Sequence, residues 1–253
     1  MLFELNEEVL KRRRKIFVIG DLHGDYTSFK KAVGQADFDQ DFLIFLGDYA
    51  DRGEQGVEII EHLHSYLVKY PQSLVALKGN HEIYSDDGIP KFNPCDLIDE
   101  AERKRSGWDV FFNRELKPFF SRLYLSTIIP GKALFVHAGI TSEITSAKDL
   151  KSPSAELEKN VLWSDATDDD IYETFNILRG TGKIFGPQLT QNVCENLGVR
   201  QIIRSHEPRK AMKGPHYQHD DRIVTVSSTS VYGGRPHMLA FDNRLENPQT
   251  IYL

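Results

Sequence analysis

The chain has little cysteine. Its 253 residues include only Cys95 and Cys194, which lie far apart and in no spacing typical of metal ligands. A disulfide framework is therefore not expected, and a reducing compartment is favoured. No apolar run approaches the length that spans a membrane, and the acidic stretch 1–10 does not resemble a signal peptide. We therefore expect a cytoplasmic protein that has no membrane partner.

Positive charge is also in deficit. The 31 Lys and Arg residues face 37 Asp and Glu residues, which gives a net charge of −6. This balance argues against a broad electrostatic surface for nucleic acid, so we expect no nucleic-acid partner, although a local basic patch would survive that total. The one basic run, at residues 11–15, is expected to be a solvated lead-in to the first strand.

Internal repeats and long linkers are missing as well. The composition, 40% hydrophobic and 27% charged, is that of an ordinary globular protein long enough to bury a core. We therefore predict a single domain over residues 1–253, with residues 1–15 as its lead-in segment.

Short apolar runs rich in β-branched residues predict buried strands. Five of them carry the argument: residues 16–19, 42–46, 74–77, 133–136 and 201–203. Helical patterns at 26–35 and 55–70 separate the first three, and this β-α-β-α-β order favours a parallel sheet. The stretch 96–123 is expected to be helical. From about residue 121 the pattern changes to strands and loops, with strands at 123–129, 222–227, 238–241 and 250–253 and surface loops at 142–154 and 165–170. Two facing sheets would suit this order.

A polar motif follows directly after each of the five strands. The motifs are Gly20-Asp21-Leu22-His23-Gly24, Gly47-Asp48-Tyr49-Ala50-Asp51-Arg52-Gly53, Gly79-Asn80-His81-Glu82, His137-Ala138-Gly139 and Arg204-Ser205-His206. Ligands of open α/β sheets bind outside the carboxyl ends of the strands, so these motifs are expected to converge on one metal site.

The residue types indicate which metals would bind. Carboxylate, imidazole and amide oxygen together suit Mn, Fe or Zn better than Ca. Six candidate ligands are enough for two ions, and Asp48 is the expected bridge between them. Such a pair lowers the pKa of a shared water, which yields a hydroxide nucleophile, so no nucleophilic serine or cysteine is required.

In this order and at these separations, the motifs resemble the metal-dependent phosphoprotein phosphatases of the calcineurin-like metallophosphoesterase superfamily, which act on phosphoserine and phosphothreonine. Similar stretches continue at Leu162-Trp163-Ser164-Asp165, at Arg179-Gly180 and at Tyr232, so the resemblance runs from about residue 16 to 242. It implies an α/β fold in which two mixed sheets form a β-sandwich flanked by helices, with a dinuclear metal site at the carboxyl ends of the strands.

The resemblance also implies residue roles. One ion would be bound by Asp21, His23 and Asp48, and the other by Asp48, Asn80, His137 and His206. The cofactor would be two ions, preferably Mn, with Fe or Zn as alternatives. Arg52 and Arg179 would bind phosphate oxygens, and Tyr232 would lie at the rim of the site and hydrogen-bond near the phosphate or a bound water. His81 would be the general acid, hydrogen-bonded by Asp51, which favours its imidazolium form.

Two departures from the family pattern concern the rim of the site. The segment before Tyr232 reads Ser228-Thr229-Ser230-Val231, and Leu178 stands before Arg179 where the family tends to place an acidic residue. Inhibitor sensitivity and groove shape are therefore not carried over, and regulatory subunits cannot be deduced. The catalytic positions themselves are unaffected.

The implied partner is a phosphorylated protein or peptide, whose phosphomonoester would be hydrolysed without a phosphoenzyme. Three other functions are weighed against this one. The same scaffold serves symmetrical dinucleoside tetraphosphate hydrolases, but Asp51, Arg52, His81 and Arg179 together favour phosphoprotein monoesters. A phosphodiesterase or nuclease fits the acidic net charge poorly. A non-catalytic scaffold would be expected to have lost metal ligands, and all six are present.

Overall fold

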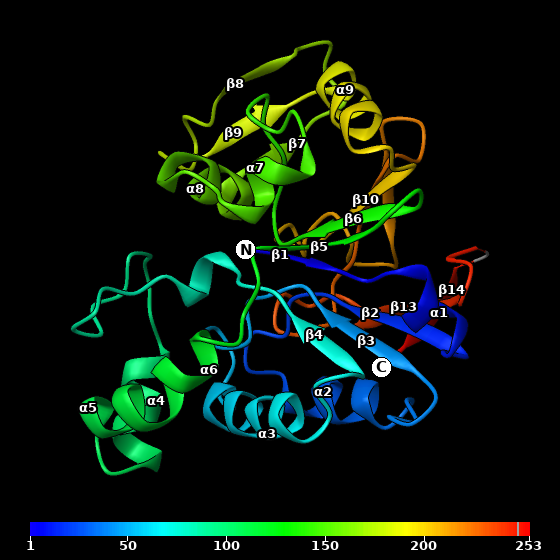
Figure 1. The fold of residues 1–253 in the computed structure, drawn as a ribbon. Helices are drawn as coiled ribbons and strands as arrows, with labels where there is room; N and C mark the ends of the chain where they lie inside the picture. The colour runs from blue at the N-terminus through cyan, green and yellow to red at the C-terminus, as the bar shows by residue number, and fades with distance from the viewer. Residues whose placement is uncertain (247) are drawn as a thin grey trace.

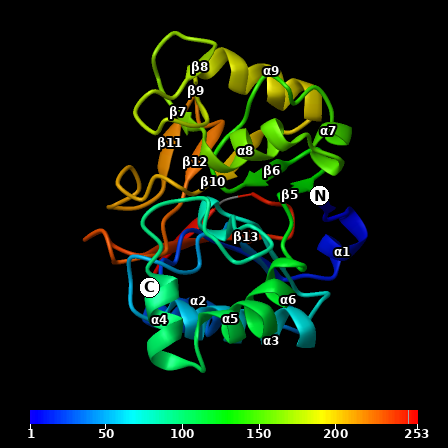
Figure 2. The same ribbon diagram turned by 90° about the vertical axis from the view of Figure 1, so that its left-hand side faces the viewer.

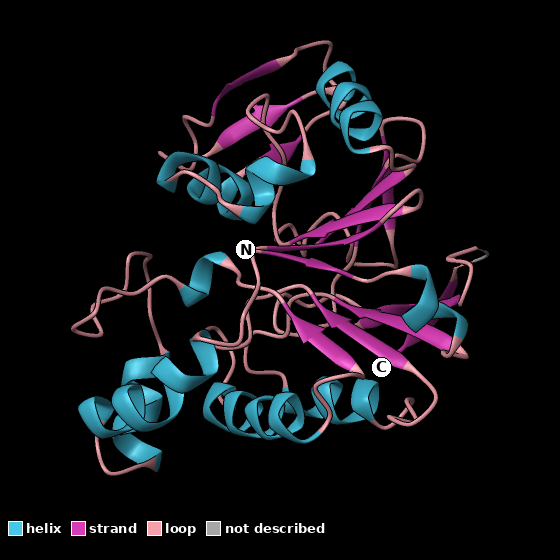
Figure 3. Ribbon diagram, viewed as in Figure 1, coloured by secondary structure: helices cyan, strands magenta, loops and turns pink. Residues whose placement is uncertain are grey.

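Two β-sheets lie face to face, and helices cover both outer faces, in the computed structural model of the chain (Figure 1; Figure 3). The structure describes residues 1–246 and 248–253. The predicted architecture, an α/β β-sandwich of two mixed sheets with flanking helices, is confirmed.

The first sheet has five strands in the order β14-β13-β2-β3-β4. Their bounds are Gln249–Tyr252 (β14), His237–Asp242 (β13), Lys15–Ile19 (β2), Phe42–Phe45 (β3) and Leu74–Ala76 (β4). Strands β2, β3 and β4 are parallel, as predicted, and β13 is antiparallel to both β2 and β14. The crossovers are the predicted helices α2 (Tyr26–Val33) and α3 (Gly56–Lys69).

The second sheet has six strands in the order β1-β5-β6-β10-β12-β11. Their bounds are Leu2–Glu4 (β1), Ser126–Ile129 (β5), Ala133–Val136 (β6), Gln201–Arg204 (β10), Ile223–Thr225 (β12) and His216–Gln218 (β11). Strands β6, β10 and β12 are parallel. A small third sheet, in the order β7-β9-β8, consists of Asp165–Ala166 (β7), Lys183–Phe185 (β9) and Glu173–Phe175 (β8).

Side-chain alternation along the strands explains the layers. In β2, Ile16 and Val18 pack between the two sheets, whereas Phe17 and Ile19 pack on the helix side. Successive strand residues point to opposite faces, so a run that is apolar at every position is buried on both. Helices α2 and α3 cover the outer face of the five-stranded sheet, and the helices of the second half cover the other sheet (Figure 2).

The remaining helices lie in three groups. The predicted helical stretch 96–123 contains α4 (Leu97–Lys104), α5 (Trp108–Phe111), the π-helical turn η2 (Phe112–Leu116) and α6 (Lys117–Phe120). The second half contains α7 (Ala147–Lys151), α8 (Ala155–Trp163) and α9 (Pro187–Leu197). A 3₁₀ turn, η1, covers Asn80–Glu82, and α1 covers Glu7–Lys11.

Several sequence expectations were wrong in the second half of the chain. We expected strands and loops there, yet α8 and α9 pack on the six-stranded sheet through Leu157, Val161, Leu189 and Val193. The expected loop 142–154 contains α7, and the expected loop 165–170 begins with strand β7. Apolar contacts with the sheet stabilise these helices.

Residues 1–15 also contain more structure than a lead-in. Strand β1 pairs in parallel with β5, and helix α1 is capped by the side chain of Asn6. The basic run is not fully solvated, because Arg14 donates two hydrogen bonds to the buried carboxylate of Asp41, at 3.1 and 2.7 Å. Among the described residues, no helix has the length and apolar character needed to cross a membrane.

Candidate metal centre

The five motifs meet at one edge of the sandwich. Strands β2, β3 and β4 of one sheet, and β6 and β10 of the other, each end just before a motif. A parallel bridge between Asp21 and Ser227 joins the two sheets at this edge. The convergence predicted from the strand ends is therefore observed.

The backbone at this edge turns through the left-handed region. Nine non-glycine residues among those described have positive φ, and five of them are predicted site residues: His23, Asp48, Asp51, Arg52 and His206, with φ between 44° and 71°. Each such residue costs about 1 kcal/mol or more, and such strain persists only where the surroundings hold it in place.

Glu82 holds the loops after β3 and β4 together. Its buried carboxylate accepts hydrogen bonds from the backbone N–H groups of Asp48 (2.9 Å), Tyr49 (3.1 Å) and Gly79 (2.8 Å). Burial raises the pKa of Glu82 to about 7, although these hydrogen bonds act to lower the pKa. The role of Glu82 is not evident from the sequence, because its partners become neighbours only in the folded chain.

Asp48 lies between two clusters of possible ligand atoms. Its Oδ2 is 3.5 Å from Nε2 of His23, and its Oδ1 is 3.5 Å from Nε2 of His137. One cluster joins Asp48 with His23 and His81, and the other joins it with His137 and His206. Asp48 is the carboxylate common to both clusters, which is the arrangement a bridging ligand requires.

Backbone carbonyls orient the imidazoles of His23 and His137. Nδ1 of His23 donates to the carbonyl of Ala50 at 3.1 Å, and Nδ1 of His137 donates to that of Leu46 at 2.9 Å. With Nδ1 as the donor, the lone pair of each Nε2 faces the cluster. Burial lowers the pKa of both rings, that of His137 to about 3, so both are neutral and able to bind a metal.

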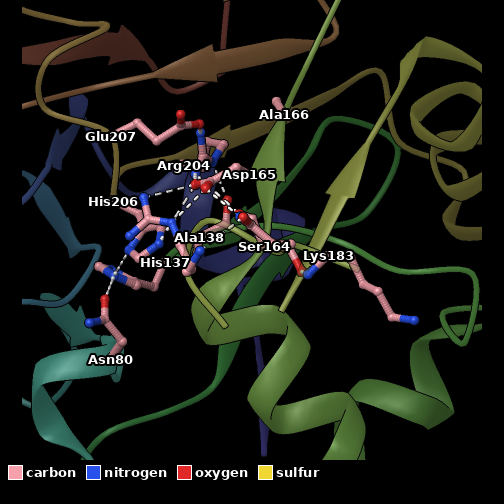
Figure 4. Close-up of polar contacts among 12 residues, drawn as sticks. Asn80, His137, Ala138, Ser164, Asp165, Ala166, Lys183, Arg204, His206 and Glu207 are labelled. Atoms are coloured by element: carbon pink, nitrogen blue, oxygen red, sulfur yellow. Dashed lines mark hydrogen bonds and ion pairs between the residues drawn. The ribbon is translucent and has the colours of Figure 1, made fainter. Parts of the chain in front are cut away.

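The second cluster brings an amide oxygen and imidazole nitrogens together (Figure 4). Nε2 of His137 lies 3.0 Å from Oδ1 of Asn80 and 3.1 Å from Nδ1 of His206. Nε2 of His206 is buried and has no hydrogen-bond partner among the described residues. An amide oxygen and imidazole nitrogens gathered at this spacing, one of them without a partner among the described residues, are ligands that a divalent cation accepts, so this set fits a metal ion.

Asp21 is buried beside the clusters rather than inside either one. Both of its carboxylate oxygens lie 3.1 Å from the backbone N of His206, and Oδ1 is 3.8 Å from Nδ1 of His137. Burial raises the pKa of Asp21 to about 6, and burial together with Asp21 and Glu82 raises that of Asp48 well above its usual range. Bound cations would lower the pKa of both carboxyl groups, because they favour the ionised carboxylates.

His81 and Asp51 form the predicted pair. Nδ1 of His81 is 2.7 Å from Oδ2 of Asp51, and both side chains are buried. Oδ1 of Asp51 accepts from the backbone N–H groups of Asp96 (2.6 Å) and Leu97 (2.8 Å), which fixes the carboxylate at the start of α4. The His81 ring meets that of His23 edge-on, with the centroids 5.0 Å apart. The pair therefore stands directly beside the first cluster.

The predicted phosphate-binding residues line a cavity above the clusters. This cavity, of about 170 Å³, is bounded by Arg52, Arg179 and Tyr232 together with His23, Asp48, Asn80, His81 and His206. The Tyr232 hydroxyl lies 3.5 Å from Nε2 of His23, and Nη1 of Arg52 donates to the carbonyl of Pro94 at 3.4 Å. Two guanidinium groups therefore face the pocket over the possible metal ligands.

Asp165 is a site residue that the sequence analysis missed, because it was assigned to a surface loop. Its carboxylate accepts two hydrogen bonds from Arg179, from Nε at 2.5 Å and from Nη2 at 3.0 Å. The same carboxylate lies 3.7 Å from Nε2 of His206 (Figure 4). The signal in the sequence was its place in Leu162-Trp163-Ser164-Asp165, a stretch that resembles the phosphatase family.

Arg204 is a third residue whose role the sequence does not reveal, after Glu82 and Asp165. Its side chain is fully buried and donates to the carbonyls of Ala138 and Ser164 and to the carboxylate of Glu207, the last at 2.5 Å (Figure 4). It thereby ties the motif after β6 to the motif after β10. Trp163 is only half-buried, lines the cavity and meets the His206 ring edge-on.

Comparisons with known proteins agree with this geometry. A sequence model of the family described as "Calcineurin-like phosphoesterase" matches residues 14–210. The serine/threonine-protein phosphatase PP1-delta of Caenorhabditis elegans is 26% identical over 253 residues, which covers 96% of this chain and 77% of that protein. The chain spans only 48–63% of the length of four other curated relatives.

Solved structures share the fold. A protein serine/threonine phosphatase of Saccharomyces cerevisiae, described as similar to human phosphatase PP5, superposes with a TM-score of 0.79 at 25% identity, covering 100% of this chain and 82% of that one. A protein described as a candidate diadenosine tetraphosphatase superposes with a TM-score of 0.58 at 15% identity, covering 99% and 97%, and supports the fold alone. The resemblance inferred from the motifs is confirmed, and the chain belongs to the calcineurin-like phosphoesterase family.

Proposed function

We propose that the chain hydrolyses phosphoserine and phosphothreonine monoesters in proteins, as one catalytic domain that uses two metal ions. The observation that carries the proposal is the place of Asp48, which is common to two ligand clusters below a cavity lined by Arg52 and Arg179. Mn is the preferred metal, with Fe or Zn as alternatives, because the ligand set mixes carboxylate, imidazole and amide oxygen.

The proposed ligands are Asp21, His23 and Asp48 for one ion and Asp48, Asn80, His137 and His206 for the other. When bound, two such cations supply Lewis acidity and a lowered pKa of shared water, so that direct attack on phosphorus needs no phosphoenzyme. Carbonyl-oriented imidazoles keep their Nε2 lone pairs directed at the cluster, and Glu82 holds the Asp48 backbone in its left-handed conformation.

Arg52 and Arg179 would bind the phosphate and offset the charge that grows in the transition state, since a guanidinium matches phosphate oxygens in a forked geometry. Asp165 positions Arg179 through two hydrogen bonds. Tyr232 would complete the rim by donating its hydroxyl proton to a phosphate oxygen or a bound water.

His81 would protonate the departing alkoxide. Its Nδ1 is engaged by Asp51, so Nε2 is the atom that would carry the transferred proton. The backbone N–H groups that fix Asp51 thereby keep the imidazole oriented for that transfer. An alkoxide is a poor leaving group, so this proton contributes most with serine and threonine esters.

A protein substrate is favoured over a dinucleotide by two observations. The most similar relatives described above carry the name of serine/threonine phosphatase, and the complete set of Asp51, Arg52, His81 and Arg179 surrounds one pocket. Hydrolysis of dinucleoside tetraphosphates is the second candidate, because one solved structure with this fold is described in those terms.

The test measures phosphate release by the metal-free protein, with and without added Mn, from three substrates. These are a phosphothreonine peptide, a phosphotyrosine peptide and diadenosine tetraphosphate. We expect Mn-dependent release that is fastest from the phosphothreonine peptide. A higher kcat/KM on the dinucleotide would move the assignment to nucleotide hydrolysis, and no release from any of the three would contradict a catalytic role.

A further inference from the structure

A groove of basic side chains leads away from the candidate metal centre along residues 207–216. A cavity of about 470 Å³ is lined by Arg52, Arg179 and Tyr232 at the site and extends to Arg209 and Lys210. A second cavity, of about 450 Å³, shares Arg209 and Lys210 and continues to Lys213 and His216. The two cavities lie on either side of these shared residues, and we call them together the basic trough.

The charge of the trough is opposite to that of the chain. Its lining includes five cationic side chains and one carboxylate, that of Glu207, in a chain of net charge −6. Glu207 is neutralised locally, because it accepts from buried Arg204 at 2.5 Å and from Lys210 at 3.0 Å. The trough is therefore a local patch of positive potential, of the kind that an acidic net charge leaves open.

The outer cations of the trough have no neutralising partner. Arg209 and Lys213 are exposed, and neither forms an ion pair with any residue of the described ranges 1–246 and 248–253. The inner cations differ, since Arg179 is paired with Asp165 and Lys210 with Glu207. Positive charge is thus uncompensated at the end of the trough that lies beyond the phosphate-binding residues.

We propose that the basic trough is a subsite for a second anionic group of the substrate, either an acidic side chain or a second phosphate near the phosphoester that is cleaved. This inference rests on the proposed function, because the trough begins at Arg52 and Arg179, where the first phosphate would bind. An extended peptide held there lies beside Arg209 and Lys213, and its acidic flank meets their charges. The sequence preference would then come from this flank.

The experiment compares three phosphothreonine peptides that differ only in flanking residues: neutral, aspartate-rich, and carrying a non-hydrolysable phosphonate as the second phosphate. The variant is the double substitution Arg209→Ala/Lys213→Ala. The matched control is Arg12→Ala/Lys31→Ala, which removes two exposed charges elsewhere and so changes the net charge equally. The readout is the ratio of kcat/KM for each anionic peptide to that for the neutral peptide, at two salt concentrations.

For the unaltered protein and the control we expect a ratio of about five, as two solvent-exposed charge contacts would give, and a smaller ratio at high salt. In Arg209→Ala/Lys213→Ala the ratio should fall to about one through a change in KM. The anionic peptide with the larger ratio identifies the preferred group. A ratio near one in the unaltered protein, or a ratio that survives in the trough variant, overturns the inference while leaving the phosphatase assignment intact. If the protein hydrolyses none of the peptides but does hydrolyse diadenosine tetraphosphate, the proposed function is overturned instead.

Discussion

Replacing His81 by Asn should separate substrates by their leaving groups. The substitution removes the ring nitrogens but keeps the backbone N–H that donates to Asp48 at 3.0 Å, so the shared carboxylate retains that support. It also leaves Asp51 with the backbone N–H groups of Asp96 and Leu97, so the carboxylate stays satisfied. The expected defect is therefore confined to proton transfer.

The magnitude follows from the role. Loss of a general acid costs about 10²- to 10⁴-fold in rate, or about 3 to 5 kcal/mol of transition-state stabilisation. For a phosphothreonine peptide we expect a loss of at least about 100-fold in kcat. For 4-nitrophenyl phosphate, whose phenolate leaves as a stable anion, we expect a loss below about 10-fold, because little protonation is required.

The assay measures kcat on both substrates together with the Mn content of the same samples. His62→Asn is the control, since His62 is exposed on α3 and bonds to Tyr26 and to its own helix. Equal losses on the two substrates, or a nearly full rate on the peptide, would refute the role of His81. Loss of bound Mn would instead make His81 a metal ligand, which its place in the first cluster allows geometrically.

Three further changes test the surroundings of the site. Asp165→Asn should raise KM for phosphopeptides about tenfold, with a smaller effect on kcat, because Arg179 loses its charged partner; steady-state kinetics checks this. Arg204→Met should lower the free energy of unfolding by about 3 kcal/mol in urea titrations, since it leaves buried carbonyls without their donor and Glu207 with Lys210 as its one remaining cation among the described residues. The pKa of Glu207 is lowered because Arg204 and Lys210 outweigh the opposing effect of burial, so its ion pairs stabilise the fold at neutral pH and are lost as the pH falls below about 4.5. Glu207→Gln should therefore make stability less steeply dependent on pH in that acid range, and an unchanged slope would contradict this.

The first half of the fold could be predicted because local pattern and tertiary structure agree there. The run 16–19 is apolar at every position because both faces of β2 are covered, by helices on one side and by the other sheet on the opposite side. Polar residues such as Asp21 and Asp48 directly after such runs mark strand ends, and parallel strands bring those ends to one edge.

Helices α8 and α9 show where the prediction failed although signals were present. Helix α9 begins at Pro187 and ends before Gly198, which has a φ of 62°, and these are ordinary start and stop residues. Helix α8 is capped by the Ser154 side chain, which accepts from the backbone N of Leu157. The turn-rich composition of this half nevertheless favours strands and loops.

The roles of Glu82, Asp165 and Arg204 could not be predicted from local pattern. Each is a charged side chain whose partners lie on other elements: Glu82 bonds to the loop after β3, Asp165 to Arg179, and Arg204 to Ala138. A buried charge is stable only when paired, and the pairing is set by the fold rather than by spacing along the chain.

Binding of Mn to the metal-free protein tests the central claim most directly, because every proposed step depends on two ions that share Asp48. Equilibrium dialysis should give two Mn ions per chain for the unaltered protein and fewer than one for Asp48→Asn. Two ions that persist after the substitution, or no binding to the unaltered protein, would contradict the proposed centre.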